Sequence, residues 1–110
     1  MNIYDTANKL SAEIRASEEY ANYKMAREVI NLRPDLKDEI SKFEALRYEV
    51  QISQMQTGKM DEEKMKQIQE IYTRIIEIDE IKKYFDAELK FNVLFADVNK
   101  IIGEAVKDLV

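Results

Sequence analysis

The sequence contains neither cysteine nor histidine in its 110 residues. Without cysteine the chain can form no disulfide, cannot bind an Fe–S cluster through thiolates and has no thiolate nucleophile. Without histidine it also lacks the usual imidazole base and the commonest zinc ligand. These absences make a cytoplasmic bacterial protein the simplest interpretation, and we expect no bound cofactor and no metal site.

Glycine and proline are also scarce, with two glycines and one proline. Sheets and their tight turns usually need more of both, so this composition favours an all-α fold. The hydrophobic fraction of 45% is enough for a core, and the charged fraction of 35% indicates long solvated helix faces. The length fits one domain, and we expect residues 1–110 to form a single helical domain.

Basic runs and long apolar runs are both missing. The net charge is −5, and no basic run is longer than Lys82-Lys83. A protein that binds phosphate backbones needs a basic surface, so we expect no direct nucleic-acid binding. The start of the chain does not resemble a signal peptide, and no apolar stretch approaches membrane-spanning length. We therefore expect no membrane insertion.

Apolar residues recur at helical spacing and predict five helices. The first runs from about Ile3 to Ala16. Ser17 is then the expected N-cap of a second helix that carries Tyr20, Tyr23 and Ile30, although a kink at Ser17 within one helix is the alternative.

The third helix is expected over 34–57, because proline favours the first helical position and Gly58 favours a helix end. Asp61 is the expected cap of the fourth helix. Near Ile78-Asp79 the chain pauses, and Asp79 can cap a fifth helix that runs to the end. The alternative is that the fourth and fifth helices are continuous.

The third and fifth helices are too long for a compact monomer. They would span roughly 36 Å and roughly 45 Å, whereas a small domain is about 30 Å across. Their apolar stripes continue to the helix ends, so the overhanging parts need a partner. We therefore expect a helical bundle of long antiparallel helices that forms a homodimer or tetramer through these stripes.

Catalytic chemistry has little support in the sequence. Acidic pairs are present, at Glu18-Glu19, Asp38-Glu39, Glu62-Glu63 and Asp79-Glu80. Each pair lies at a predicted helix start or on a polar face, where carboxylates favour the helix dipole and solvent. We therefore expect no catalytic residues, although a metal-dependent enzyme that uses carboxylates alone remains a weak alternative.

Three charged residues interrupt apolar stripes and are candidates for partner binding. Arg47 lies between Phe43 and Val50, Glu88 lies between Phe85 and Phe91, and Asp97 is a weaker third case. One expectation is that Arg47 and Glu88 form a pair across helices, since unpaired buried charges are rare. The alternative is that each side chain extends to the edge of the core and keeps its charge in solvent.

Several short motifs resemble the YlbF/YmcA family of small bacterial helical proteins. The opening matches in Tyr4-Asp5-x-Ala7-x-x-Leu10 and in Ile14-x-x-Ser17-Glu18-Glu19-Tyr20-x-x-Tyr23. The middle matches in Gln51-x-x-Gln54-Met55-Gln56-x-Gly58. The last part matches in Tyr84-Phe85-x-Ala87-Glu88-x-x-Phe91-x-x-Leu94-x-x-Asp97-Val98-x-x-Ile101-Ile102. The short form of the chain is most similar to the YheA-like (UPF0342) branch.

This resemblance implies an all-α dimer, or a dimer of dimers. It also implies a regulatory role, because some family members act in a multi-protein complex that influences competence, sporulation and biofilm formation through RNA processing. The Fe–S clusters that some members bind through cysteines do not carry over to this cysteine-free chain.

We therefore expect a non-enzymatic regulatory adapter whose partners are itself and, beyond itself, paralogous family members or an RNA-processing complex. The alternative is a structural or chaperone-like interaction protein. The candidate interface positions, which the resemblance and the stripe analysis supply together, are Ser17, Glu18, Tyr20, Tyr23, Arg47, Glu88, Phe91 and Asp97.

Overall fold

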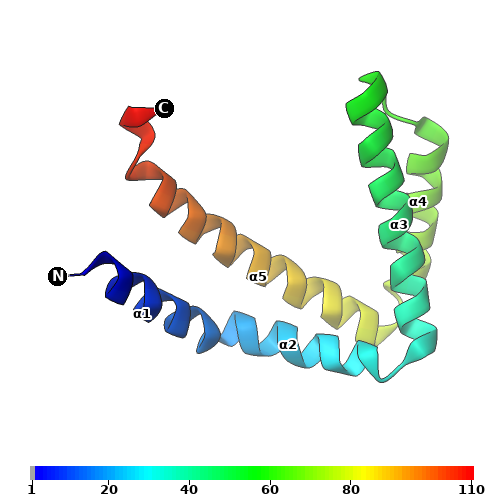
Figure 1. Cartoon of the computed structure of the whole chain (residues 1–110). Coiled ribbons are helices and arrows are strands. Elements are labelled where there is room, and N and C mark those ends of the chain that lie inside the picture. The colour runs from blue at the N-terminus through cyan, green and yellow to red at the C-terminus, as the bar shows by residue number, and fades with distance from the viewer. Residues whose placement is uncertain (1) are drawn as a thin grey trace. The chain divides into compact units, whose positions relative to one another are not determined.

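The computed structural model describes residues 2–110, and this part of the chain is all-α (Figure 1). No helix in it combines the length and the hydropathy needed to cross a bilayer. The elements in chain order are α1 (Ile3–Arg15), α2 (Glu18–Asn31), α3 (Pro34–Thr57), α4 (Glu62–Ile75), α5 (Asp79–Glu104) and a 3₁₀ turn, η1 (Lys107–Leu109).

Both ends of α3 and the start of α4 confirm the predictions made from punctuation residues. Pro34 is the first residue of α3, where its missing N–H costs nothing. Gly58 ends α3 in the left-handed conformation, with φ at 71°, and its N–H donates to the Gln54 carbonyl at 2.8 Å. The Asp61 carboxylate accepts from the Lys64 N–H at 3.1 Å and so caps α4.

Other boundaries differ from the expectations or choose between them. A short break separates α1 from α2, so the kinked single helix is wrong, and α4 and α5 are likewise separate. Asp79 is the first residue of α5 and forms an ion pair with Lys83 at 3.0 Å. The expectation that this helix runs to the chain end is wrong, because α5 ends at Glu104 and residues 105–106 form a turn.

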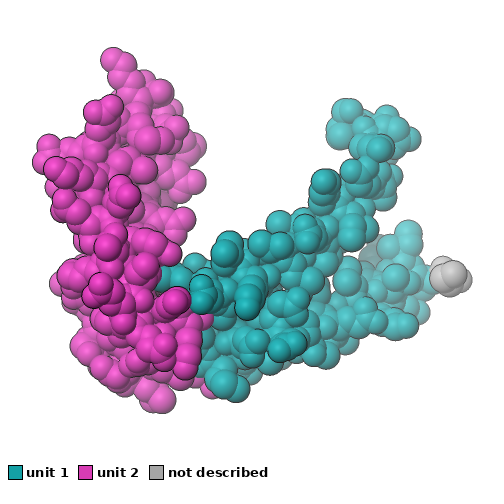
Figure 2. Space-filling model, turned by 180° about the vertical axis from the view of Figure 1, so that it is seen from behind, with its two compact units in different colours: residues 1–27, 84–110 teal, residues 28–83 magenta. Residues whose placement is uncertain are grey.

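The chain divides into two compact units, coloured in Figure 2. Unit 1 comprises residues 1–27 and 84–110, and unit 2 comprises residues 28–83. Almost the whole buried core of the described residues lies in unit 2, namely Ile30, Leu36, Ile40, Phe43, Val50, Ile75 and Ile81. Burying one such side chain stabilises a fold by roughly 1.5–3 kcal/mol, so unit 2 holds most of the hydrophobic stabilisation.

Unit 2 is organised by the antiparallel hairpin of α3 and α4, which lie side by side in Figure 1. The predicted α3 stripe supplies its core, and the rings of Phe43 and Tyr72 lie 5.7 Å apart between centroids. One edge carries ion pairs across the hairpin, from Arg74 to Glu39 at 2.8 Å and from Lys64 to Glu49 at 3.7 Å. These pairs are exposed and add little stability, but they favour the observed register.

Unit 1 has a much thinner core. Among the described residues of this unit only Ala87 is buried, and half-buried aromatic side chains form contacts between its helices. Many large apolar side chains remain exposed on α5, including Leu89, Val93, Ile101 and Ile102. The apolar stripe predicted for this helix is therefore present, and much of it is not covered within the unit.

We predict opposite effects on stability from alanine at the two glycines. Gly58→Ala should lower the free energy of unfolding by about 1 kcal/mol, because φ is positive there and no neighbouring atom lies within 4 Å of the added Cβ. Gly103→Ala, the matched control in α5, also meets open space but has no positive φ, and should raise stability by a few tenths of a kcal/mol. Urea denaturation of both variants measures this, and equal effects would contradict the backbone argument.

Candidate interaction site

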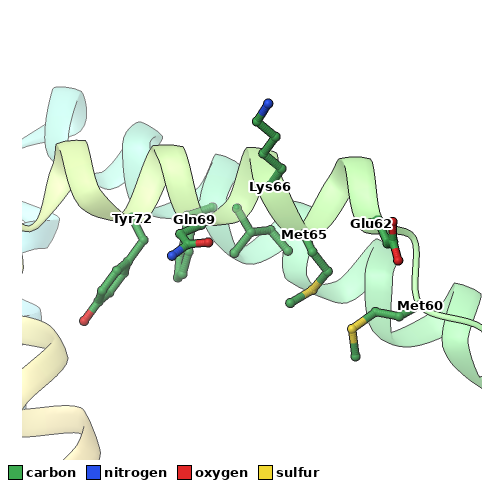
Figure 3. A pocket seen from close by; sticks show the side chains of 8 residues that line it. Met60, Glu62, Met65, Lys66, Gln69 and Tyr72 are labelled. Carbon is green, nitrogen blue, oxygen red and sulfur yellow. The ribbon is translucent and has the colours of Figure 1, made fainter.

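A shallow apolar groove of about 510 Å³ lies along one flank of the α3–α4 hairpin (Figure 3). The groove residues are Phe43 of α3, Met60 of the connecting loop, and Glu62, Met65, Lys66, Ile68, Gln69 and Tyr72 of α4. Its floor is apolar and its rim is polar. This arrangement suits the apolar side chains of a bound polypeptide better than a small polar substrate.

The groove exists because α4 presents a wider apolar face than α3 can cover. Ile68 and Ile75 turn toward α3, whereas Met65 and Tyr72 lie on the flank, where they remain 37% and 40% exposed. Met60 is 51% exposed at the loop end. In Figure 3 the Met60, Met65 and Tyr72 side chains point to the same side of α4, and the Lys66 ammonium points away from them. Methionine side chains adapt their shape to a partner, so such a face suits binding.

Arg47 stands beside this groove. It lies one turn after Phe43 on α3, and its guanidinium carbon is 5.6 Å from the centroid of the Phe43 ring, which lines the groove. The side chain is exposed, so its charge remains in solvent while it contacts the aromatic face. The predicted interruption of the α3 stripe is therefore an exposed cation at the edge of an apolar surface.

A second group of candidate residues gathers in unit 1 between α2 and α5. The Tyr23 ring lies 5.7 Å from Phe91, and Tyr20 meets Phe91 edge-on at 6.1 Å. The Tyr23 hydroxyl donates to Glu88 Oε2 at 3.1 Å, and all four side chains are half-buried. This hydrogen bond gives the polar interruption of the α5 stripe a partner, and it fixes which turn of α5 faces Tyr23.

The pKa of Tyr23 is raised above its ordinary value of 10.0. Burial is the main cause, since the phenolate loses solvation, and the negative charge of Glu88 acts in the same direction. Tyr84 and Arg27 favour the phenolate and oppose the shift. The hydroxyl is therefore held in its neutral form, which can donate to Glu88 but is unsuited to act as a base near neutral pH.

The remaining candidates are Ser17, Glu18 and Asp97. Ser17 caps α2, since its Oγ accepts from the Tyr20 N–H at 3.1 Å and donates to the Ile14 carbonyl at 2.6 Å. Glu18 is exposed in the first turn of α2, and Asp97 is exposed on α5. Between residues 2 and 110, no group of three acidic, histidine or cysteine side chains is arranged as a metal site.

The structure thus brings together Tyr20, Tyr23, Glu88 and Phe91. Arg47 and Glu88 belong to different units, where Arg47 contacts Phe43 and Glu88 accepts from Tyr23. The groove was not predicted from the sequence. Part of its signal was present, because Met65 and Tyr72 follow the apolar spacing of α4, but spacing alone does not show which flank the neighbouring helix leaves uncovered.

Comparison with known proteins identifies the class to which this helical chain belongs. The family model described as control of competence regulator ComK, YlbF/YmcA, matches residues 3–107. The chain therefore belongs to the YlbF/YmcA family, as its motifs predicted.

The curated relatives indicate a branch within this family, because they bear the designation UPF0342. One from Pediococcus pentosaceus is 35% identical over 99% of this chain and 96% of its own length. Another from Clostridium novyi is 33% identical over 98% of this chain and 95% of its own. A third, from Symbiobacterium thermophilum, is 33% identical over 94% and 93%. The resemblance to the UPF0342 branch is thus confirmed along nearly the whole chain.

We predict that Ser17→Ala lowers the free energy of unfolding by about 1 kcal/mol, because the α2 N-terminus loses its side-chain acceptor. The control is Ser11→Ala, an exposed position within α1 where alanine has the higher helix propensity and no loss is expected. Thermal or urea unfolding distinguishes the two. A Ser17→Ala variant as stable as the parent protein would show that the cap contributes nothing.

We predict that Tyr23→Phe costs about 1 kcal/mol near neutral pH, because Glu88 loses its donor. Since the folded pKa of Tyr23 is raised, its neutral form stabilises the fold fully below about pH 10, and this contribution is lost as the pH rises through the folded pKa. The parent protein should therefore lose more stability than Tyr23→Phe above pH 10. Urea unfolding across this range measures it, and parallel pH profiles would refute the coupling.

Proposed function

We propose that this chain is a non-enzymatic regulatory adapter that works as a homo-oligomer through protein–protein contacts. The observation that carries the proposal is the uncovered apolar surface of α5. Leu89 is 64% exposed, Val93 52%, Ile101 71% and Ile102 55%, and these side chains lie on a helix with one buried residue beyond position 83. Exposed apolar rows of this extent mark association surfaces in soluble proteins.

The expected first partner is a second copy of the chain. Unit 1 combines a thin core with a long apolar helix, and pairing with another copy would bury this surface on both chains at once. The further partners we propose are paralogous family members or an RNA-processing complex. The family description, control of the competence regulator ComK, supports a regulatory context.

Charge supports protein partners rather than nucleic acid. The net charge is −5, and Lys64 and Arg74 at the hairpin edge form ion pairs with carboxylates. A surface of this kind repels phosphate backbones. We therefore propose that any effect on RNA processing acts through contacts with other proteins.

A structural or chaperone-like role is the second candidate, and the methionine-lined groove is the feature that favours it. Met60 and Met65 can repack around different apolar segments, which suits weak binding of many partners. A regulatory adapter should instead bind few partners strongly. The number and stoichiometry of partners therefore separate the two functions.

The test is a tagged pull-down from the native cell with crosslinking and mass spectrometry, together with light scattering of the purified protein. We expect a homo-oligomer in solution, and stoichiometric recovery of a paralogue or an RNA-processing enzyme. A Leu89→Lys/Val93→Lys variant should lose self-association, whereas Lys24→Ala, an exposed control on α2, should not. A monomeric parent protein, or one that recovers nothing beyond itself, would overturn the adapter role.

The absence of enzymatic activity is tested by metal addition. A metal that carboxylates bind only in the folded state must stabilise the fold and so raise the melting temperature. At a metal concentration a few times the Kd, the added free energy of unfolding is about 1 kcal/mol. We expect no shift with Mg²⁺, Mn²⁺ or Fe²⁺. A concentration-dependent rise with one of them would revive a carboxylate-based metal enzyme.

A further inference from the structure

Four charged groups lie beside two separate apolar surfaces and form no ion pair among the described residues; Lys66, which lines the groove with its ammonium pointing away from the methionine side chains (Figure 3), forms none either. Arg47 and Glu62 flank the groove of the α3–α4 hairpin. Asp97 and Lys100 lie on the exposed surface of α5. None of these four groups takes part in an ion pair within residues 2–110.

The outer face of α5 is the surface opposite the residues that contact α2. Leu89, Val93 and Ala96 follow one another at steps of four and three, so they form one row on the helix. All three are exposed, whereas Phe91, Leu94 and Val98 on the other side are half-buried. Asp97 borders this row, and Lys100 continues it one turn later.

The groove has matching dimensions. Its apolar floor from Met65 to Tyr72 covers two turns of α4, and the row from Leu89 to Ala96 covers two turns of α5. Both surfaces are therefore about 10 Å long. A helix laid along a hydrophobic groove of this length is a common mode of recognition between proteins.

The charges match in order as well as in sign. Along the groove toward the α3–α4 loop, the cation Arg47 comes first and the anion Glu62 follows. Along α5 toward its C-terminal end, the anion Asp97 comes first and the cation Lys100 follows. A helix that runs parallel to α3 would bring each charge near one of opposite sign, and the reverse direction would not.

We propose that the outer face of α5 of a second copy docks in the α3–α4 groove, with Ala96 against Met65, Asp97 beside Arg47 and Lys100 toward Glu62. The inference rests on the proposed homo-oligomer and names the two surfaces that form it. It gives the methionine flank of α4 and the uncovered row of α5 one common function, and it gives Arg47, Glu62, Asp97 and Lys100 partners of opposite charge.

The test is a disulfide between copies, because the chain has no cysteine of its own. A tagged Met65→Cys chain is co-expressed with an untagged Ala96→Cys chain, oxidised, and analysed on non-reducing gels and by mass spectrometry. We expect a disulfide between residues 65 and 96 of two chains. The matched control is Met55→Cys, a more exposed methionine on α3 that does not line the groove and should give no such link.

Charge reversal is the second measurement. Arg47→Glu and Asp97→Arg should each raise the Kd of self-association about tenfold, and the double variant should recover most of this loss. Lys37→Glu, an exposed change on α3 away from the groove, is the control for net charge. Failure of the double variant to recover would overturn the pairing of Asp97 with Arg47.

The outcomes separate this inference from the function on which it rests. A homo-oligomer by light scattering that forms no 65–96 disulfide overturns the docking and leaves the proposed oligomer intact. An internal disulfide in a monomeric Met65→Cys/Ala96→Cys chain overturns the second copy as the occupant. A parent protein that stays monomeric at all concentrations removes the proposed oligomer itself.

Discussion

The packing of the α3 stripe against α4 is the interaction on which the rest of the structure depends. Phe43 and Ile75 are buried at this contact, and the two helix ends that meet the hairpin contribute Ile30 and Ile81 to the same core. Without this core, the groove would have no floor. The ion pairs at the hairpin edge are exposed, so hydrophobic burial and not charge carries the stabilisation.

Unit 1 shows the opposite balance. Its helices are well formed, with a serine cap at α2 and a tyrosine–glutamate hydrogen bond between α2 and α5, yet Ala87 is the one buried residue among those described in this unit. Local signals thus determine its helices, while little within the unit covers its apolar surface. A protein whose apolar residues are placed in this way is suited to association, and this balance supports the adapter role we propose.

The sequence predicted helix boundaries well where a single residue starts or ends a helix. Pro34, Gly58 and Asp61 act through local backbone geometry and hydrogen bonding, so their effects can be read from the sequence. The predicted end of the fifth helix was wrong, because the apolar pattern continues beyond Glu104 and no proline marks the end of the helix in the sequence. Among the candidate site residues, Tyr20, Tyr23 and Phe91 lie together, a contact between two helices that spacing within each helix does not predict. The groove could not be foreseen, because it depends on which flank of α4 the neighbouring helix leaves open.

The uneven distribution of the core also has a consequence for the motions of the chain. Backbone amides in α3 and α4 are protected by packed side chains, so they should exchange with solvent deuterium only when unit 2 opens. Residues 101–110 are exposed throughout, and their amides should exchange through local fraying. The chain would then contain a slowly exchanging helical hairpin and a rapidly exchanging C-terminal segment, and a protease would cleave that segment first.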